Sequence, residues 1–363
     1  MDAGDAWSPP FAPGDPAPWF VAPTPGQPNF HFSTTVGRYL LLGFLPSPGP
    51  ARDAAFQAFQ AHRAAFDDAR LTAFMVLPDA ASIAEARNQP PGLRWFLDAQ
   101  GELAALYGAA RPYWLLLDPA HGVLGAYPLA DTVGLFAQIE ALPPVEEHAR
   151  TELYAPVLIV PRVFDRPTCR RLIDIFEAEG GAPSGVMRDV DGRTVGVLDN
   201  FKRRRDVTIA DPALRQELRG YLARRLVPEI AKVFQFEVTR VERYTVARYD
   251  AADGGYFRPH RDNETLGTAH RRFAVSINLN AEAFEGGDLR FPEFGPRTYR
   301  PPTGGAVVFS CSLQHEATPV TRGRRYAFLP FLYDEAGAKV REENLKFLDA
   351  EAPQPSAAAG VQG

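Results

Sequence analysis

Residues 256–262 read Tyr-Phe-Arg-Pro-His-Arg-Asp, and they lie in the part of the chain whose pattern decides the fold. From about 237 to 334, short β segments follow one another and are separated by Gly and Pro turns. A strand-like run at 157–160 and a helix at about 211–234 come before them. Helices followed by a run of antiparallel strands predict an α+β domain whose strands form a sandwich or barrel.

In the first half of the chain, apolar runs of strand length alternate with helical segments. The apolar runs lie at 37–45, 71–77, 113–117 and 122–127, and the last helix is expected at about 130–142. This alternation predicts an α/β domain in which helices cover a mixed sheet.

The segment 141–150 separates the two patterns, because it mixes prolines with charges and has no apolar period. Both ends of the chain are rich in proline and small residues and are expected to be mobile. We therefore predict a flexible N-terminus at 1–12, an N-terminal domain at 13–145, a linker at 146–156, a C-terminal domain at 157–335 and a C-terminal tail at 336–363.

The composition excludes several classes of protein. The chain has 39 Lys and Arg against 44 Asp and Glu, and this net charge of −5 gives no bulk attraction to nucleic acid or to an anionic membrane. Its two cysteines, Cys169 and Cys311, are too few for a disulfide framework or a four-cysteine metal site. The sequence has no recognisable export signal and no apolar run of about 20 residues, so we expect a cytoplasmic protein.

Three side chains form a candidate metal site. His260 and Asp262 are two residues apart, so they point to the same face of an extended segment. His315 lies 53 residues after Asp262, which leaves enough chain for the intervening strands to cross a barrel and return. Two histidines and one carboxylate leave three positions open on an octahedral ion, as in non-haem Fe(II) oxygenases. Zinc would favour a more closed, tetrahedral site.

Those open positions suit a bidentate 2-oxo acid and dioxygen, and the far carboxylate of such a cosubstrate needs a cation. Arg325 is the candidate, because it lies ten residues beyond His315, across a turn expected at 321–323. Its guanidinium can form paired hydrogen bonds with a carboxylate. Arg324 is expected on the opposite face of the same strand.

The stretch from about 157 to 335 resembles the Fe(II)/2-oxoglutarate-dependent oxygenases of the prolyl 4-hydroxylase type. The resemblance is carried by HRD at 260–262, EGGDLRFP at 285–292 and HEATPVTRGRRY at 315–326. It implies a double-stranded β-helix (jelly-roll) core, Fe(II), 2-oxoglutarate as cosubstrate, and L-ascorbate as a reductant. By position, His260, Asp262 and His315 match the iron ligands, and Arg325 matches the residue that binds the distal carboxylate of 2-oxoglutarate.

The resemblance also points to two further residues. Tyr249 matches the tyrosine that hydrogen-bonds the cosubstrate, although the loop after it has two extra residues. Asn278 stands where collagen-type members have tyrosine, and it shares one face of a strand with Ser276 and Asn280, so we place it among the cosubstrate-binding candidates. A half-exposed strand is the alternative interpretation of this face. Because Asp262 is retained, hydroxylation is favoured over halogenation, since halogenating members have a small residue there.

The N-terminal half resembles peroxiredoxins and related thioredoxin-like proteins through GDPAPWF at 14–20 and RPYWLLLDPAHGVLGAY at 111–127. Pro112 is expected at the cis-proline position of this fold. Residues 1–168 contain no cysteine, so the domain lacks a peroxidase nucleophile. We therefore expect a thioredoxin-like domain without catalysis of its own, retained for homodimerisation, substrate presentation or partner binding.

Two further features have open interpretations. The basic run 202–205 could flank a channel for an acidic peptide, but a solvated loop is the default. His270 could approach the mouth of the site, or it could be an ordinary loop histidine.

The sequence thus predicts a 2-oxoglutarate-dependent dioxygenase that hydroxylates an unactivated C–H bond of a peptide, protein or small molecule. One alternative is a non-catalytic scaffold with a degenerate oxygenase domain. The other is a thiol peroxidase, which the missing N-terminal cysteine disfavours.

Overall fold

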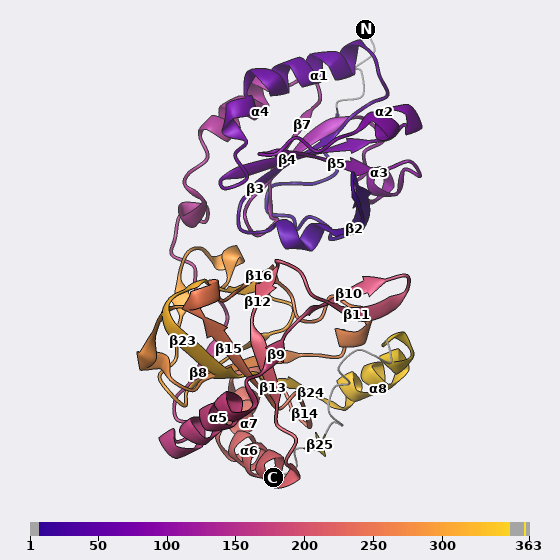
Figure 1. Ribbon diagram of the computed structural model, residues 1–363. Coiled ribbons are helices and arrows are strands. Elements are labelled where there is room, and N and C mark those ends of the chain that lie inside the picture. The colour runs from indigo at the N-terminus through magenta and orange to yellow at the C-terminus, as the bar shows by residue number, and fades with distance from the viewer. Residues whose placement is uncertain (1–6, 349–358, 361–363) are drawn as a thin grey trace. The chain divides into compact units, whose positions relative to one another are not determined.

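The computed structural model describes residues 7–348 and 359–360, and it divides into two compact units (Figure 1). The first unit contains Met1–Tyr154 together with Pro292–Gly295, and the second contains Ala155–Phe291 and Pro296–Gly363. In the described part of the chain, no helix combines the length and the apolar character needed to cross a bilayer.

The N-terminal unit is built on one five-stranded sheet. Its strand order is β5 (Leu93–Leu97), β4 (Leu71–Leu77), β3 (Tyr39–Phe44), β6 (Tyr113–Leu117) and β7 (Val123–Pro128). Strands β3, β4 and β5 are parallel, β6 runs antiparallel to β3, and β7 runs antiparallel to β6. A separate hairpin is formed by β1 (Val21–Thr24) and β2 (Gln27–His31).

Both faces of the sheet are buried, which explains why its strands are continuous apolar runs. In β3, Leu41 packs on one face with α1 and α4, whereas Leu42 packs on the other face with α3. The arrangement confirms the expected α/β thioredoxin-like fold. The helices of this unit are α1 (Pro50–Ala61), α2 (Ala80–Glu85), α3 (Glu102–Leu106) and α4 (Thr132–Glu140).

Two details of this unit differ from expectation. The peptide bond before Pro112 is trans, and the cis bond among the described residues precedes Pro91. Part of the N-terminus expected to be flexible is packed, since the ring of Trp7 lies 6.1 Å from that of Tyr113. Residues 1–6 lie outside the described residues.

The C-terminal unit consists mainly of two antiparallel sheets, which form the expected jelly-roll core. The smaller sheet has the order β12 (Lys202–Arg203), β16 (Tyr256–His260), β22 (His315–Ala317), β19 (Leu289–Arg290) and β20 (Thr298–Tyr299). The main path of the larger sheet is β25 (Ala359–Gly360), β14 (Arg240–Glu242), β24 (Phe331–Tyr333), β17 (Phe273–Asn278), β23 (Val320–Phe328), β15 (Thr245–Asp250), β13 (Arg205–Thr208) and β9 (Ala182–Pro183). Off this path, β21 (Ala306–Ser310) pairs with β17 and with β8 (Leu158–Val160), and β18 (Phe284–Gly286) pairs with β23. A two-stranded hairpin of β10 (Val186–Val190) and β11 (Arg193–Val197) stands apart from both sheets.

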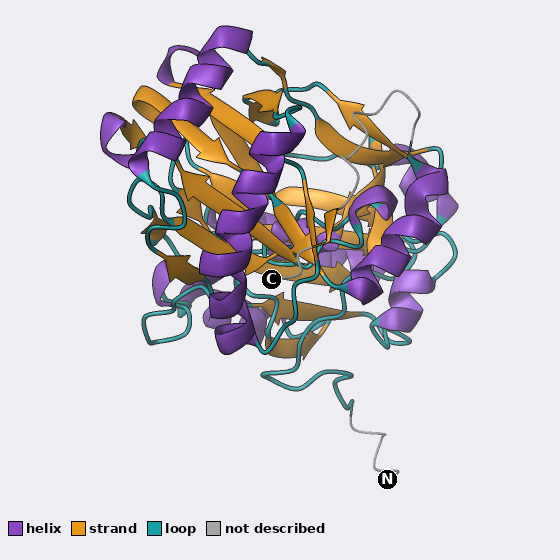
Figure 2. Cartoon of the chain, turned by 90° about the horizontal axis from the view of Figure 1, so that it is seen from below, coloured by secondary structure: helices purple, strands orange, loops and turns teal. Residues whose placement is uncertain are grey.

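Three helices lie together on one side of this unit (Figures 1 and 2). They are α5 (Arg166–Glu179), α6 (Pro212–Arg225) and α7 (Val227–Phe234). Phe176 of α5 and Leu218 of α6 are fully buried in one core with Ile277 of β17. The prediction of a single helix at 211–234 is wrong. The helix is interrupted at Leu226, and Pro228 occupies the first turn of a new helix.

Two further expectations for this unit are corrected. The turn expected at 321–323 lies earlier, because β23 already begins at Val320. The segment expected to be a tail from 336 onward begins with a helix, α8 (Glu335–Asn344), whose N-cap is Asp334. Most of the rest of the tail, 349–358 and 361–363, lies outside the described residues.

We expect Gly323→Ala to destabilise the C-terminal domain more than Gly254→Ala. Both glycines have a positive φ, +74° and +68°, which costs a residue with a side chain about 1–2 kcal/mol. A Cβ at position 323 would also lie 2.4 Å from the carbonyl oxygen of Ala283, whereas position 254 has nothing within 4 Å. Denaturant unfolding measures both losses, and equal losses would contradict the packing of β23 on β18.

Candidate metal centre

Two neighbouring strands bring the predicted metal ligands together. His260 ends β16 and lies opposite His315, the first residue of β22. The Nε2 atom of His315 lies 3.3 Å from Oδ2 of Asp262, and Nε2 of His260 lies 3.6 Å from Oδ1 of the same carboxylate. Among the described residues, this is the one group of potential ligands whose donor atoms all lie within 4.8 Å of one another.

Both imidazole rings are oriented by the main chain. Nδ1 of His260 lies 2.7 Å from the carbonyl oxygen of Arg258, and Nδ1 of His315 lies 3.1 Å from that of Leu313. A carbonyl oxygen only accepts, so each Nδ1 carries the proton and donates it. In the neutral form of each ring, Nε2 then carries the lone pair and faces the Asp262 carboxylate, which is the tautomer that metal coordination requires.

The loop that carries Asp262 is held from two sides. The Asp262 N–H donates to the carbonyl oxygen of Cys311 over 3.0 Å, and Nη1 of Arg271 donates to the Asp262 carbonyl oxygen over 3.3 Å. Nε of Arg271 also binds the fully buried carboxylate of Glu242, at 2.6 Å. Glu242 on β14 thus fixes the arginine that fixes the loop.

Burial sets the protonation of the ligand group. It lowers the pKa of His315 to about 4, with His260 as the next cause. Burial alone would raise the pKa of Asp262, but the neighbouring His315 and His260 hold that pKa below its usual range. At neutral pH, His315 is therefore neutral and Asp262 is ionised, as metal ligands must be.

Arg325 lies on β23, and only 3% of it is exposed. Its Nη2 donates to Oγ of Ser276 over 2.8 Å, and its guanidinium carbon lies 5.2 Å from the ring centre of Tyr249, its cross-strand partner on β15. Among the described residues it has no carboxylate partner, whereas Arg324 binds Asp250 on the outside. A buried guanidinium without an anion is a ready site for a ligand carboxylate.

The face of β17 that was expected to line a site does so in part. Oδ1 of Asn278 accepts a long, 3.4 Å hydrogen bond from Nε of Arg325, and its amide nitrogen donates to the carbonyl oxygen of Pro301. Ser276 contacts Arg325 as described, but Asn280 binds the main chain of Arg324 and Tyr326. The amide of Asn278 therefore orients Arg325, and its direct contact with a cosubstrate stays a prediction.

Two residues of the basic run 202–205, for which the sequence left two interpretations open, lie close to the predicted ligands. The default interpretation of 202–205 as a solvated loop is wrong, because Lys202 on β12 is 7% exposed and the side chain of Arg204 is 6% exposed. Lys202 pairs with Phe257 of β16, and the ring of Phe257 stacks on that of His260. The alternation of Lys202 and Arg204 with Arg203 was the available signal, since alternate residues of a strand share a face.

Two buried residues, His270 and Cys311, do not belong to the group of predicted ligands. His270 is not at the mouth of the site, because its Nε2 lies 2.9 Å from the buried carboxylate of Glu242. The thiol of Cys311 is buried, which raises its pKa well above the usual value. The contribution of Cys311 to the site is its carbonyl oxygen, which accepts from Asp262.

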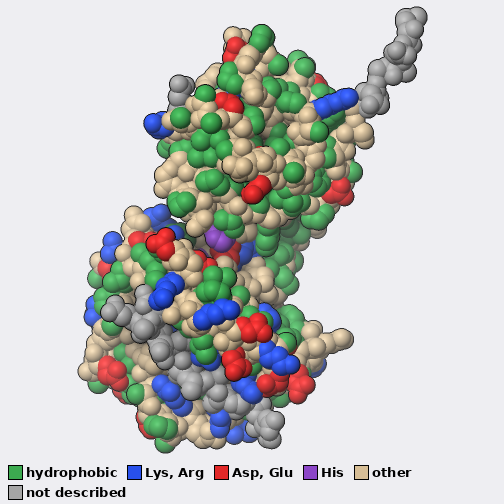
Figure 3. Space-filling view, turned by 90° about the vertical axis from the view of Figure 1, so that its right-hand side faces the viewer, with side chains coloured by type: hydrophobic (Ala, Val, Ile, Leu, Met, Phe, Trp, Pro, Cys, Tyr) green, Lys and Arg blue, Asp and Glu red, His purple; other side chains and the backbone are tan. Residues whose placement is uncertain are grey.

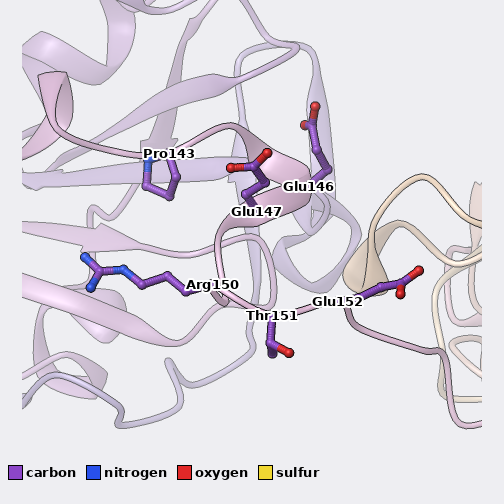
Figure 4. A pocket seen from close by; sticks show the side chains of 6 residues that line it. All are labelled: Pro143, Glu146, Glu147, Arg150, Thr151 and Glu152. Carbon is purple, nitrogen blue, oxygen red and sulfur yellow. The ribbon is translucent and has the colours of Figure 1, made fainter.

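The rest of the surface offers weaker features. An open hollow on the segment after α4 is lined by Pro143, Glu146, Glu147, Arg150, Thr151 and Glu152, whose charged groups point in different directions (Figure 4). On the face seen in Figure 3, acidic and basic side chains of the C-terminal unit are interspersed and form no field of one sign. None of the candidate site residues lines the hollow.

Residues 244–333 match the 2OG-Fe(II) oxygenase superfamily, and this range contains all three predicted ligands and Arg325. The C-terminal region therefore contains a 2OG-Fe(II) oxygenase domain. At family level, this implies Fe(II) and 2-oxoglutarate. The donor set fits such an ion, because two imidazole Nε2 atoms and one carboxylate converge, and no further His, Cys, Asp or Glu joins the group in the described part of the chain.

Individual relatives are more distant. The chain is 28% identical over 167 residues to a PKHD-type hydroxylase of Bordetella pertussis. The matched region covers 44% of this chain and 72% of that protein. A Trichoplax adhaerens prolyl hydroxylase, solved with a hypoxia inducible factor peptide, is 19% identical and matches 52% of this chain and 86% of its own, with a TM-score of 0.39. The thiol:disulfide interchange protein DsbE of Chlorobium tepidum is 24% identical and matches 36% of this chain and 96% of its own, with a TM-score of 0.31.

We expect Arg271→Gln to weaken Fe(II) binding by roughly 10- to 100-fold, as is usual when a residue that orients a metal ligand is lost. The glutamine cannot hold the Asp262 carbonyl and the Glu242 carboxylate together. Anaerobic competition with a chelator measures the affinity. Arg272→Gln is the matched control, because Arg272 donates to the Ala269 carbonyl oxygen instead. Equal affinities of the two variants would contradict the role given to Arg271.

Proposed function

We propose that this protein is an Fe(II)- and 2-oxoglutarate-dependent dioxygenase, similar to prolyl 4-hydroxylases, that hydroxylates an unactivated C–H bond. One observation carries the proposal: two oriented imidazoles and a carboxylate converge within 4.8 Å in the same domain as a buried arginine, Arg325, that forms no ion pair with any described residue. The overall reaction converts R–H, dioxygen and 2-oxoglutarate into R–OH, succinate and carbon dioxide.

The residues divide the work between binding and orientation. His260, Asp262 and His315 hold the metal, which supplies the oxidising chemistry once 2-oxoglutarate and dioxygen are bound. Arg325 binds the distal carboxylate of 2-oxoglutarate, and the hydroxyl of Tyr249 donates a hydrogen bond to it. Ser276 and Asn278 keep the guanidinium in place, so the cosubstrate meets a preformed site.

Apolar rings around the ligands keep water away from the reacting centre. Phe257 stacks on His260, and the ring of Phe309 lies 4.5 Å from that of His315. Exclusion of water protects the reaction from side reactions and strengthens the electrostatic contacts inside.

We assign no catalysis to the N-terminal domain, since residues 1–168 lack a cysteine. Homodimerisation, substrate presentation and partner binding are the roles that remain in this proposal. L-ascorbate as a reductant, a cytoplasmic location and a peptide, protein or small-molecule substrate also belong to the proposal.

Anaerobic addition of Fe(II) and 2-oxoglutarate to the full chain should produce a visible metal-to-ligand charge-transfer band. His315→Ala should abolish the band, because only two protein ligands remain. Absorption spectroscopy measures this directly. A colourless wild-type protein under conditions in which it is folded would refute the cosubstrate assignment.

Arg325→Met should raise the KM for 2-oxoglutarate by about 10- to 100-fold, since each charge-assisted hydrogen bond contributes roughly 1.5–3 kcal/mol. The measurement is succinate formation at varied 2-oxoglutarate. Arg324→Met is the control, because the side chain of Arg324 is 53% exposed and pairs with Asp250. If both variants keep the wild-type KM, Arg325 does not bind the cosubstrate.

A further inference from the structure

Lys202 and Arg204 are two further cations with little exposure in the oxygenase domain, and Arg204 lies against the same Tyr249 ring as Arg325. Nζ of Lys202 donates to Oγ of Ser184 over 2.6 Å and to the carbonyl oxygen of Gly185 over 2.9 Å. Among the described residues, no carboxylate forms an ion pair with Lys202. Its hydrogen bonds go to neutral groups, and the carboxylates of Asp206 and Asp262 act on its charge only from beyond ion-pair distance.

Both cations lie against the aromatic rings that border the metal ligands. Nζ of Lys202 is 4.8 Å from the ring centre of Phe257, which stacks on His260. The guanidinium carbon of Arg204 is 5.9 Å from the same ring and 5.8 Å from the ring of Tyr249. The pair thus lines the inside of the domain between the metal ligands and the tyrosine of the cosubstrate site.

The carboxylate of Asp206 does not balance this group. Asp206 binds Arg204 at 2.6 Å and also lies 3.6 Å from Nη2 of Arg243, so two arginines already share its charge. Burial and the neighbouring Arg204 lower the pKa of Lys202 well below its usual value. An anion beside Lys202 would offset that destabilisation of its charged form.

Lys202 acts on the same carboxylate, so three cations, Lys202, Arg204 and Arg243, share the single negative charge of Asp206. The group therefore keeps an excess of positive charge, which a bound anion would reduce.

We propose that Lys202 and Arg204 form a second anion subsite, which binds a carboxylate of the substrate. The inference rests on the proposed function and names the substrate class: a molecule with a carboxylate close to the C–H bond that is hydroxylated. That carboxylate is either an acidic side chain of a peptide or the free carboxyl group of a small acid. The experiment below separates these two sources.

The test measures how candidate substrates stimulate succinate formation by the Fe(II)-loaded full chain. In the first arm, pentapeptides with blocked termini and random flanking residues carry a central Glu in one pool and a central Gln in the other. In the second arm, a mixture of N-acetyl amino acids is compared with the corresponding amides. Wild type should prefer the carboxylate member of one arm by at least about tenfold, which a single charge-assisted contact supplies.

Lys202→Met should remove the preference for the carboxylate, and Lys202→Arg should restore part of it. Arg203→Met is the matched control, because Arg203 lies on the same strand but is exposed, and this variant should keep the wild-type preference. The charge-transfer band with 2-oxoglutarate identifies the variants that fold and bind Fe(II) and 2-oxoglutarate. If Lys202→Met shows no band, its substrate preference is not interpreted, and the preference of Lys202→Arg is compared with wild type instead.

Wild type that forms the band but shows no carboxylate preference in either arm would overturn this inference and leave the proposed function intact. A preference that survives in Lys202→Met would also overturn it, as would a Lys202→Met effect confined to the KM for 2-oxoglutarate. A wild-type protein that forms no band would instead refute the proposed function.

Discussion

The convergence of three donor atoms within 4.8 Å is the constraint on which the chemistry of this protein depends. Free imidazoles would not keep such a geometry. In this domain, the main chain holds both Nδ1 atoms of the histidines, and Cys311 and Arg271 hold the loop of Asp262. These hydrogen bonds orient the three side chains before any metal binds, so the site is preformed.

The jelly-roll core buries several charged side chains near the predicted metal ligands. The two sheets bury polar side chains that face inward, and each buried charge needs a partner. Glu242 meets this need with His270 and Arg271, and Asp206 meets it with Arg204. Arg325 and Lys202 form no ion pair with any residue that the structure describes, so we expect the cosubstrate and substrate to supply further negative charge.

The spacing of residues along the sequence was enough to predict part of the metal site. His260 and Asp262 are two residues apart at one strand end, so their proximity follows from strand geometry. Arg325 lies on β23 in the larger sheet, whereas His315 lies on β22 in the smaller sheet, so their placement depends on how the two sheets pack. The burial of Lys202 could not be predicted in the same way, because β12 has only two residues and its inward face depends on pairing with β16. The Glu242–His270 pair joins residues 28 positions apart, and only the three-dimensional fold brings them together.

A crystal structure of the anaerobic complex with Fe(II) and 2-oxoglutarate would test the central claim most directly. The account predicts a metal bound by Nε2 of His260, Nε2 of His315 and the carboxylate of Asp262, with the distal carboxylate of 2-oxoglutarate on Arg325. A metal held by other side chains, or a cosubstrate whose distal carboxylate lies away from Arg325, would contradict it.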